Sequence, residues 1–190
     1  MRLVLASASP RRLDLLARIG VSPDEVDAPA TDETPGKAEL PVAYVRRMAA
    51  AKAAVVAPRH PDALVLAADT VVAVGRRILP KADTEADARA CLRLVSGRRH
   101  RVLTAVTLAA PGGKARHRMS TSIVTFKRLH PDEIDAYIAC REWTGKAGGY
   151  AIQGRAEALV RAMSGSWSGI VGLPLFETRA LLDGVGYPLG

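Results

Sequence analysis

The fold is decided by one stretch of the sequence, Ala63-Leu64-Val65-Leu66-Ala67-Ala68-Asp69-Thr70-Val71-Val72-Ala73-Val74. It is a continuous apolar run that only Asp69-Thr70 interrupts, a pattern typical of a strand buried on both faces. Gly75 follows directly and predicts a turn into a second strand at Ile78-Leu79. The sequence therefore predicts a buried hairpin, with the acid placed at the end of a strand formed by the first apolar segment.

A strand and two helices are predicted on the N-terminal side of this hairpin. Leu3-Val4-Leu5-Ala6 predicts a short buried strand, and Ser9-Pro10 supplies a capping side chain and a first-turn proline for a helix over 11–19. Residues 22–41 are rich in proline and acidic residues and indicate a loop. Apolar residues at helical spacing predict a second helix over 41–57.

The C-terminal half alternates between helical and strand-like patterns. A glycine-rich segment, 145–154, is expected to lead into a strand. The other predicted elements are helices over 84–95, 131–141, 156–163 and 173–184, and strands over 100–109 and 118–127. Because helices and strands are mixed and no repeat or linker is visible, the sequence predicts one α/β domain over 1–190, two-lobed with an active cleft between the lobes.

Composition narrows the class of protein. With 190 residues, 48% of them hydrophobic, the chain is long enough to bury a sizeable core. Its two cysteines, Cys91 and Cys140, lie in helix-like segments and favour reduced thiols over a disulfide, which predicts a cytoplasmic location. The opening apolar run is too short for a signal peptide, and no stretch approaches the roughly 18 apolar residues of a membrane span. No membrane partner is expected.

The charge balance favours a polyanionic partner. The formal net charge is +8 and the pI is about 10.0, which suits nucleic acid, an anionic membrane or nucleotide phosphates. The basic residues come as isolated pairs, without aromatic residues between them and without a basic tail, which argues against nucleic acid as the primary partner. A nucleotide remains the favoured ligand, and a homodimer is left open.

The first strand-to-helix turn is a candidate phosphate site. Ser7-Ala8-Ser9-Pro10-Arg11-Arg12 places two hydroxyls, free backbone amides and two guanidinium groups at a helix N-terminus, where anions are favoured. The alternative is an ordinary capped helix with a solvated arginine pair. The glycine patterns of the Walker loop and of dinucleotide-binding turns are both absent from the sequence.

Asp69 is the most informative single residue, because a carboxylate inside an apolar run is costly to bury without a partner. It is expected to coordinate Mg²⁺ or Mn²⁺ and to orient water, although it would also suit a turn that caps Thr70. Lys52 lies on an apolar helix face and must either snorkel or meet an anion. Lys81 and the loop carboxylate Glu33 look like surface residues by themselves. The four histidines lack paired ligand spacing, so zinc is not expected.

Several motifs occur in a fixed order along the chain, and together they are specific. They are Leu5-Ala6-Ser7-Ala8-Ser9-Pro10-Arg11-Arg12, Asp32-Glu33-Thr34, Lys52-Ala53, Ala67-Ala68-Asp69-Thr70-Val71-Val72, Lys81, Leu94-Val95-Ser96-Gly97-Arg98-Arg99-His100, Lys146-Ala147-Gly148-Gly149-Tyr150-Ala151-Ile152-Gln153-Gly154 and Gly165-Ser166-Trp167-Ser168-Gly169-Ile170-Val171-Gly172-Leu173-Pro174-Leu175. In these motifs the sequence resembles the Maf, or septum-formation-inhibitor-like, nucleotide pyrophosphatases over essentially its whole length. It departs from the family pattern at Ala82 and Gly169, which affects the expected geometry of two loops.

The resemblance implies a two-lobed α/β fold, a divalent metal, Mg²⁺ or Mn²⁺, and hydrolysis of a nucleoside triphosphate to monophosphate and pyrophosphate. By position, Asp69 resembles the family's proton acceptor and a metal contact. Arg12, Glu33, Lys52 and Lys81 resemble its phosphate and metal environment, with Glu33 assigned to the metal. The nearby hydroxyls of Ser7 and Ser9 are expected to contact the substrate.

The resemblance also implies a substrate preference. The branch of the family that acts on 7-methyl-GTP tends to carry an aromatic residue at the position of Arg11, glutamine at Thr70 and glutamate at Gln153. A cationic methylated guanine would be repelled by Arg11, whereas the neutral amide of Gln153 can match uracil or thymine. We therefore expect dTTP and UTP as substrates.

Two rival hypotheses remain at this stage. The inosine triphosphate pyrophosphatases share the chemistry, but their motifs match this sequence less well. A basic nucleic-acid-binding regulator of septation is the alternative from a different class. It predicts salt-sensitive binding of DNA or RNA without turnover, whereas the enzyme predicts metal-dependent pyrophosphate release.

Overall fold

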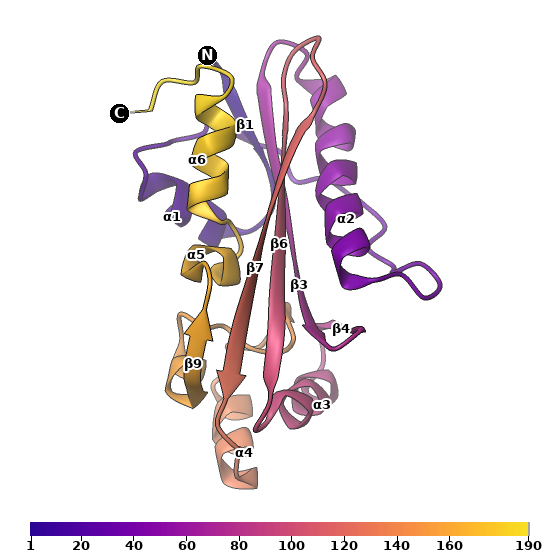
Figure 1. Ribbon diagram of the computed structural model, residues 1–190, viewed down its shortest axis with the longest axis vertical. Helices are drawn as coiled ribbons and strands as arrows, with labels where there is room; N and C mark the ends of the chain where they lie inside the picture. The colour runs from indigo at the N-terminus through magenta and orange to yellow at the C-terminus, as the bar shows by residue number, and fades with distance from the viewer. Residues whose placement is uncertain (190) are drawn as a thin grey trace.

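The protein is built around one mixed β-sheet covered by α-helices (Figure 1). The computed structural model describes residues 1–189. In that range the main sheet has the order β2-β1-β3-β6-β7-β9, with β4 paired to β3, and β5 and β8 form a separate two-stranded ribbon. The strands are β1 (Leu3–Ala6), β2 (Glu25–Val26), β3 (Leu64–Val74), β4 (Arg77–Leu79), β5 (Lys81–Ala82), β6 (Arg99–Ala109), β7 (Arg116–Phe126), β8 (Lys146–Ala147) and β9 (Val160–Ser164).

The helices gather around the two ends of the long strands. Figure 1 shows α1, α2 and α6 around the upper half of β6 and β7, with α3 and α4 at the lower end. Within the described residues no helix is both long and apolar enough to cross a membrane. The helices are α1 (Pro10–Ala17), α2 (Pro41–Val56), α3 (Glu85–Val95), α4 (Pro131–Ala139), α5 (Trp167–Val171) and α6 (Leu175–Asp183), with 3₁₀ turns at Ala57–Arg59 and Arg155–Leu159.

Strand β3 is buried on both faces, as its apolar sequence predicts. Successive side chains of a strand point to opposite faces. Val65 and Ala67 therefore pack with residues of α2, whereas Leu66 and Ala68 join the larger core that α1, α3, α4 and α6 complete. The predicted fold class, mixed α/β, is confirmed.

Asp69 lies in the middle of β3, so the prediction that it ends a strand is wrong. Strand β3 pairs with β6 without a break from Val65 opposite Ala109 to Ala73 opposite Arg101. The ladder continues through Asp69 because this carboxylate has a buried cation as partner, described below, and does not need a turn to bring it to solvent.

Two predictions in the C-terminal half are also wrong. Residues 156–163 do not form a helix: Arg155–Leu159 is a 3₁₀ turn, and Val160–Ser164 forms β9, which pairs with the edge of β7. The glycine-rich segment 145–154 contributes only the two residues of β8. Gly148 and Gly149 have φ of +69° and +70°, which turns the chain away from a strand.

The other predicted helices and strands agree with the structure to within a few residues, although the segment 22–41, predicted as a loop, also contains the short strand β2. Ser9 does not act as expected. Its backbone occupies the N-cap position of α1, yet its side chain makes no capping hydrogen bond. Instead, the hydroxyl of Ser7 accepts a hydrogen bond from the backbone N–H of Ser9 at 3.1 Å. Ser7, which follows β1, therefore stabilises the turn before α1, and the Ser9 hydroxyl does not cap the helix.

Candidate active site

The candidate site lies at a gap along one edge of strand β3, in the interior of the sheet. One edge of β3 is occupied by β6, so β1 and β4 must share the other edge. Strand β1 pairs with β3 only as far as Ala67, and the pairing of β4 with β3 starts at Val72, opposite Leu79. Residues 68–71 therefore have no paired strand on this edge of β3, although β6 pairs with them on the other edge, and a cleft of about 360 Å³ opens there.

The gap explains how two consecutive residues both reach the cleft. Asp69 and Thr70 point to opposite faces of β3, and in a continuous sheet one of them would be hidden from a ligand on the other face. Because the edge is open at this point, both residues line the same cleft. Asp69 lies on the side of α2, and Thr70 lies on the side of α5.

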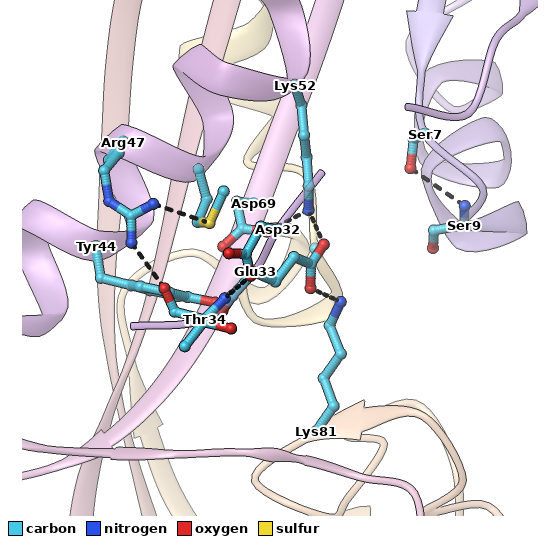
Figure 2. Close-up of polar contacts among 12 residues, drawn as sticks. Ser7, Ser9, Asp32, Glu33, Thr34, Tyr44, Arg47, Lys52, Asp69 and Lys81 are labelled. Atoms are coloured by element: carbon cyan, nitrogen blue, oxygen red, sulfur yellow. Dashed lines mark hydrogen bonds and ion pairs between the residues drawn. The ribbon is translucent and has the colours of Figure 1, made fainter. Parts of the chain in front are cut away.

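A network of two cations and two carboxylates forms the side of the cleft next to α2. Lys52 Nζ lies 2.6 Å from Asp69 Oδ1 and 2.7 Å from Glu33 Oε1, and Glu33 also pairs with Lys81. Figure 2 shows Lys52 and Lys81 pointing toward Glu33 from opposite sides. Lys52 and Asp69 are buried, with 7% and 3% of their surface exposed. Lys52 thus meets an anion, and simple snorkelling is excluded.

The charges of this network shift the pKa values of Glu33 and Tyr44. Partial burial acts to raise the pKa of Glu33, but hydrogen bonds from Lys52 and Lys81 outweigh it and lower that pKa, so Glu33 is held as a carboxylate. Tyr44 donates its hydroxyl to the backbone oxygen of Glu33 at 2.9 Å and holds the loop in place. Burial and the charge of Asp69 raise the pKa of Tyr44 to about 12, so it stays a neutral donor.

The turn between β1 and α1 forms the next part of the wall. Arg12 is buried; its Nε donates to the backbone oxygen of Gly172 at 2.9 Å, and its Nη1 donates to Ser7 Oγ at 2.8 Å. Burial lowers the pKa of Arg12 to about 10, and the charge of Asp69 opposes this shift. Arg12 is therefore a fixed cation and not a solvated surface residue, because Ser7 near the N-terminus and Gly172 near the C-terminus both bind its guanidinium group.

The opposite wall comes from residues 144–153, which carry Lys146 and Gln153. Lys146 is half-buried, and burial together with the charge of Arg11 lowers its pKa. Burial also lowers the pKa of Arg11. Within residues 1–189 no carboxylate forms an ion pair with either group. Arg11 and Lys146 thus both line the cleft as cations that have no carboxylate partner within the described residues.

The structure gathers the candidate residues proposed from sequence. Nine of them line the cleft, and the tenth, Glu33, reaches it through Lys52 and Lys81. Those nine are Ser7, Ser9, Arg11, Arg12, Lys52, Asp69, Thr70, Lys81 and Gln153. The neighbouring Asp32 is exposed and only accepts a hydrogen bond from the backbone of Thr34.

Sequence reasoning missed Lys146 and Tyr44 as parts of the site. Lys146 belongs to the glycine-rich motif, and a lysine followed by Ala147 and two glycines was the only available signal. Tyr44 lies on the same helix face as Lys52, eight residues earlier, but its contact with the loop is invisible before folding.

The cleft is suited to a polyanion. Five cationic side chains line it or its rim, namely Arg11, Arg12, Lys52, Lys81 and Lys146, against the two carboxylates Asp69 and Glu33. Residues 1–189 contain no group of three or more His, Cys, Asp or Glu side chains placed to hold a metal ion. Two neighbouring carboxylates nevertheless fit Mg²⁺, which usually takes one or two carboxylates and completes its shell with water and substrate phosphates.

Comparison with known proteins agrees with this geometry. Residues 2–185 match the family described as Maf-like protein. A dTTP/UTP pyrophosphatase of Paramagnetospirillum magneticum is 63% identical over 185 residues, covering 97% of each chain. Proteins of the same name from Sphingopyxis alaskensis and Rhodospirillum rubrum are 62% and 61% identical over 188 residues, covering 99% of this chain and 98% and 90% of theirs. The chain therefore belongs to the Maf-like protein family.

Proposed function

We propose that this protein is a nucleoside triphosphate pyrophosphatase that converts dTTP and UTP to the monophosphate and pyrophosphate. The observation that carries the proposal is the buried contact between Lys52 and Asp69 in a cleft with an excess of positive charge. An uncompensated positive cleft attracts a triphosphate, and a buried carboxylate among the cations supplies a base. The names of the similar proteins support the same substrates.

The cations hold the triphosphate chain. Arg12 is fixed by two hydrogen bonds and needs little reorganisation to meet phosphate oxygens. Lys52 and Lys81 both pair with Glu33, and the negative charges of the substrate compete with this carboxylate for them. Ser7 and Ser9 line the same wall and complete the pocket for the phosphates.

Asp69 is the proton acceptor in this scheme. Water attacks the α-phosphorus, the bond from that phosphorus to the bridging oxygen breaks, and pyrophosphate leaves with its charge stabilised by the cations. The proton of the water passes to the carboxylate of Asp69. Lys52 orients this carboxylate from the α2 side, because its Nζ contacts one oxygen, Oδ1, and the other oxygen, Oδ2, is not bound by Lys52.

Glu33 and Asp69 are the side chains that would hold a divalent cation, Mg²⁺ or Mn²⁺, together with the substrate phosphates. Bound there, the cation would supply further stabilisation of the charge that develops on the phosphate oxygens. The carboxylate state of Glu33, maintained by Lys52 and Lys81, is the state required of a metal ligand.

Residues on both walls of the cleft select the nucleobase of the substrate. Gln153 offers an amide oxygen and nitrogen, which match the alternating groups of uracil and thymine. Arg11 disfavours a cationic base such as 7-methylguanine. Thr70 lines the same cleft and is placed to contact the nucleoside. The two free cysteines are consistent with the cytoplasm as the site of action.

The test is a panel of nucleotides assayed for products with Mg²⁺, with Mn²⁺ and with a chelator. We expect dTMP or UMP with pyrophosphate, released only with metal, and a higher kcat/KM for dTTP and UTP than for 7-methyl-GTP. In Gln153→Glu this preference should fall by about tenfold, the effect of one mismatched hydrogen bond. Diphosphate and orthophosphate as products would reject the proposed reaction, and unchanged ratios in Gln153→Glu would reject the role of that residue.

A further inference from the structure

Thr70 is coupled to a second threonine that does not line the cleft. Thr70 and Thr104 lie directly opposite each other on β3 and β6, so their side chains share one face of the sheet. Their hydroxyl oxygens are 2.9 Å apart. Thr70 lines the cleft, whereas Thr104 is 1% exposed and lies behind it. Thr104 can influence a bound ligand only through its neighbours.

The single hydroxyl hydrogen of Thr104 has one fixed acceptor. Thr104 Oγ1 donates to the backbone oxygen of Gly169 in α5 at 2.7 Å. That oxygen has no helical donor, because the two amides that would supply one, those of Gly172 and Leu173, both donate to the oxygen of Ser168. Without Thr104 a buried carbonyl would be left unpaired, which is costly. The Thr104 hydrogen is therefore held toward α5.

The hydrogen of Thr70 is fixed as a consequence. A hydroxyl has one hydrogen and two lone pairs. Since Thr104 has already used its hydrogen on Gly169, the 2.9 Å contact requires Thr70 to donate and Thr104 to accept. Thr70 is then left with lone pairs only on the side that faces the cleft.

We propose that Thr104 is a positioning residue that makes Thr70 a hydrogen-bond acceptor toward the cleft, so that Thr70 binds a donor group of the nucleotide. This inference rests on the proposed function for the identity of the ligand. An acceptor placed against phosphate oxygens would be repulsive, so Thr70 faces the nucleoside part of the ligand. The nucleoside parts of dTTP and UTP share two hydrogen-bond donors, the N3–H of the base and the 3′-hydroxyl of the sugar.

Two analogues distinguish these sources in the native protein. One is dTTP methylated at N3, which lacks the base donor, and the other is 2′,3′-dideoxy-TTP, which lacks the sugar donor. We expect kcat/KM to fall by about tenfold for one of them, the effect of losing one hydrogen bond to a fixed acceptor. The fall that disappears in Thr70→Val identifies the group bound by Thr70, because Gln153 is also placed to contact the base. If both retain the value of dTTP, the proposal is overturned.

Variants at both threonines test the coupling. Thr104→Val keeps the shape of the side chain and removes the hydroxyl, so the Thr70 hydrogen is no longer held toward Thr104. The ratio of kcat/KM for dTTP to kcat/KM for the sensitive analogue should then shrink at least threefold. Thr104→Ser is the matched control and should keep the native ratio. In a Thr70→Val background, Thr104→Val and Thr104→Ser should give equal ratios, because the group they act through is gone. A ratio that still changes in that background would mean that Thr104 acts through α5, contrary to the proposal.

The inference and the proposed function fail in different ways. Lack of pyrophosphate release from any nucleotide would reject the enzyme, but the calorimetric Kd values of α,β-imido analogues with and without the donor would still test the inference. Thermal melts show whether each variant is folded at the assay temperature. If Thr104→Val is not, Thr104→Cys replaces it, because a thiol is a weak donor and should give an intermediate ratio. A native ratio in folded Thr104→Cys would count against the proposal.

Discussion

Lys52 and Asp69, which are 17 residues apart in the sequence, form a buried contact of 2.6 Å at the open edge of β3. Each group makes the burial of the other possible, because an isolated charge in this position would be strongly disfavoured. The pair therefore explains why an acid can interrupt the most apolar stretch of the chain. It also makes the site sensitive to the charge of either partner.

Asp69→Asn is expected to abolish nearly all turnover, lowering kcat by at least about 100-fold, while the protein stays folded. The amide keeps the shape of the carboxylate but neither accepts the proton nor carries its charge. The measurement is steady-state pyrophosphate release, with circular dichroism to check the fold. Asp62→Asn, at an exposed turn, is the control and should behave like the native protein. Near-native kcat in folded Asp69→Asn would rule out Asp69 as the base.

Lys146→Met is expected to raise KM for dTTP by about tenfold with a smaller change in kcat, because a cation that lines the same cleft as Arg11 helps to bind the triphosphate. The native KM should rise with salt, and the variant should show a weaker salt dependence. Lys114→Met changes a lysine in the exposed turn after β6 and serves as the control. Equal KM values for the two variants would show that Lys146 does not contact the substrate.

Gly148→Ala should destabilise the protein by about 3 kcal/mol, through backbone strain and steric overlap. A Cβ at this position would lie 2.9 Å from Cβ of Val72 in β3, and the residue has φ of +69°. Gly145→Ala is a matched control, since Gly145 has a similar φ of +65° but open space around it. It should cost only the strain, about 1 kcal/mol. Urea unfolding measures both, and equal losses would contradict the predicted overlap with Val72.

The buried His100 predicts that stability falls in mild acid. Its Nε2 lies 2.7 Å from the hydroxyl of Tyr150, and burial lowers its pKa from 6.5 to about 4. The unfolded chain therefore binds the proton more readily between these values. This pKa difference contributes about 3 kcal/mol to the free energy of unfolding. The contribution is fully present above pH 6.5 and is lost as the pH falls toward 4. Urea unfolding across this range should show the loss, and His100→Gln should flatten it. An unchanged slope in the variant would assign the loss to other groups.

The sequence by itself determined most of the elements. The apolar run of β3, the turn at Gly75 and the helical spacing of α2 depend on residues close together in the chain, and periodicity reports such local order well. It also marked Asp69 as an acid in need of a partner, because the cost of burying a charge can be inferred from its apolar neighbours.

Tertiary structure decided what those elements do. Residues 160–164 became a strand because β7 offered them an edge, which outweighed their local pattern. The Arg12 side chain is fixed by the backbone of Gly172, 160 residues away. The gap beside Asp69 and Thr70 exists only because β1 and β4 occupy different parts of one strand edge. Contacts between distant segments leave no periodic trace in the sequence, so the candidate residues could be named from their motifs, but their arrangement around one cleft became visible only in the assembled sheet.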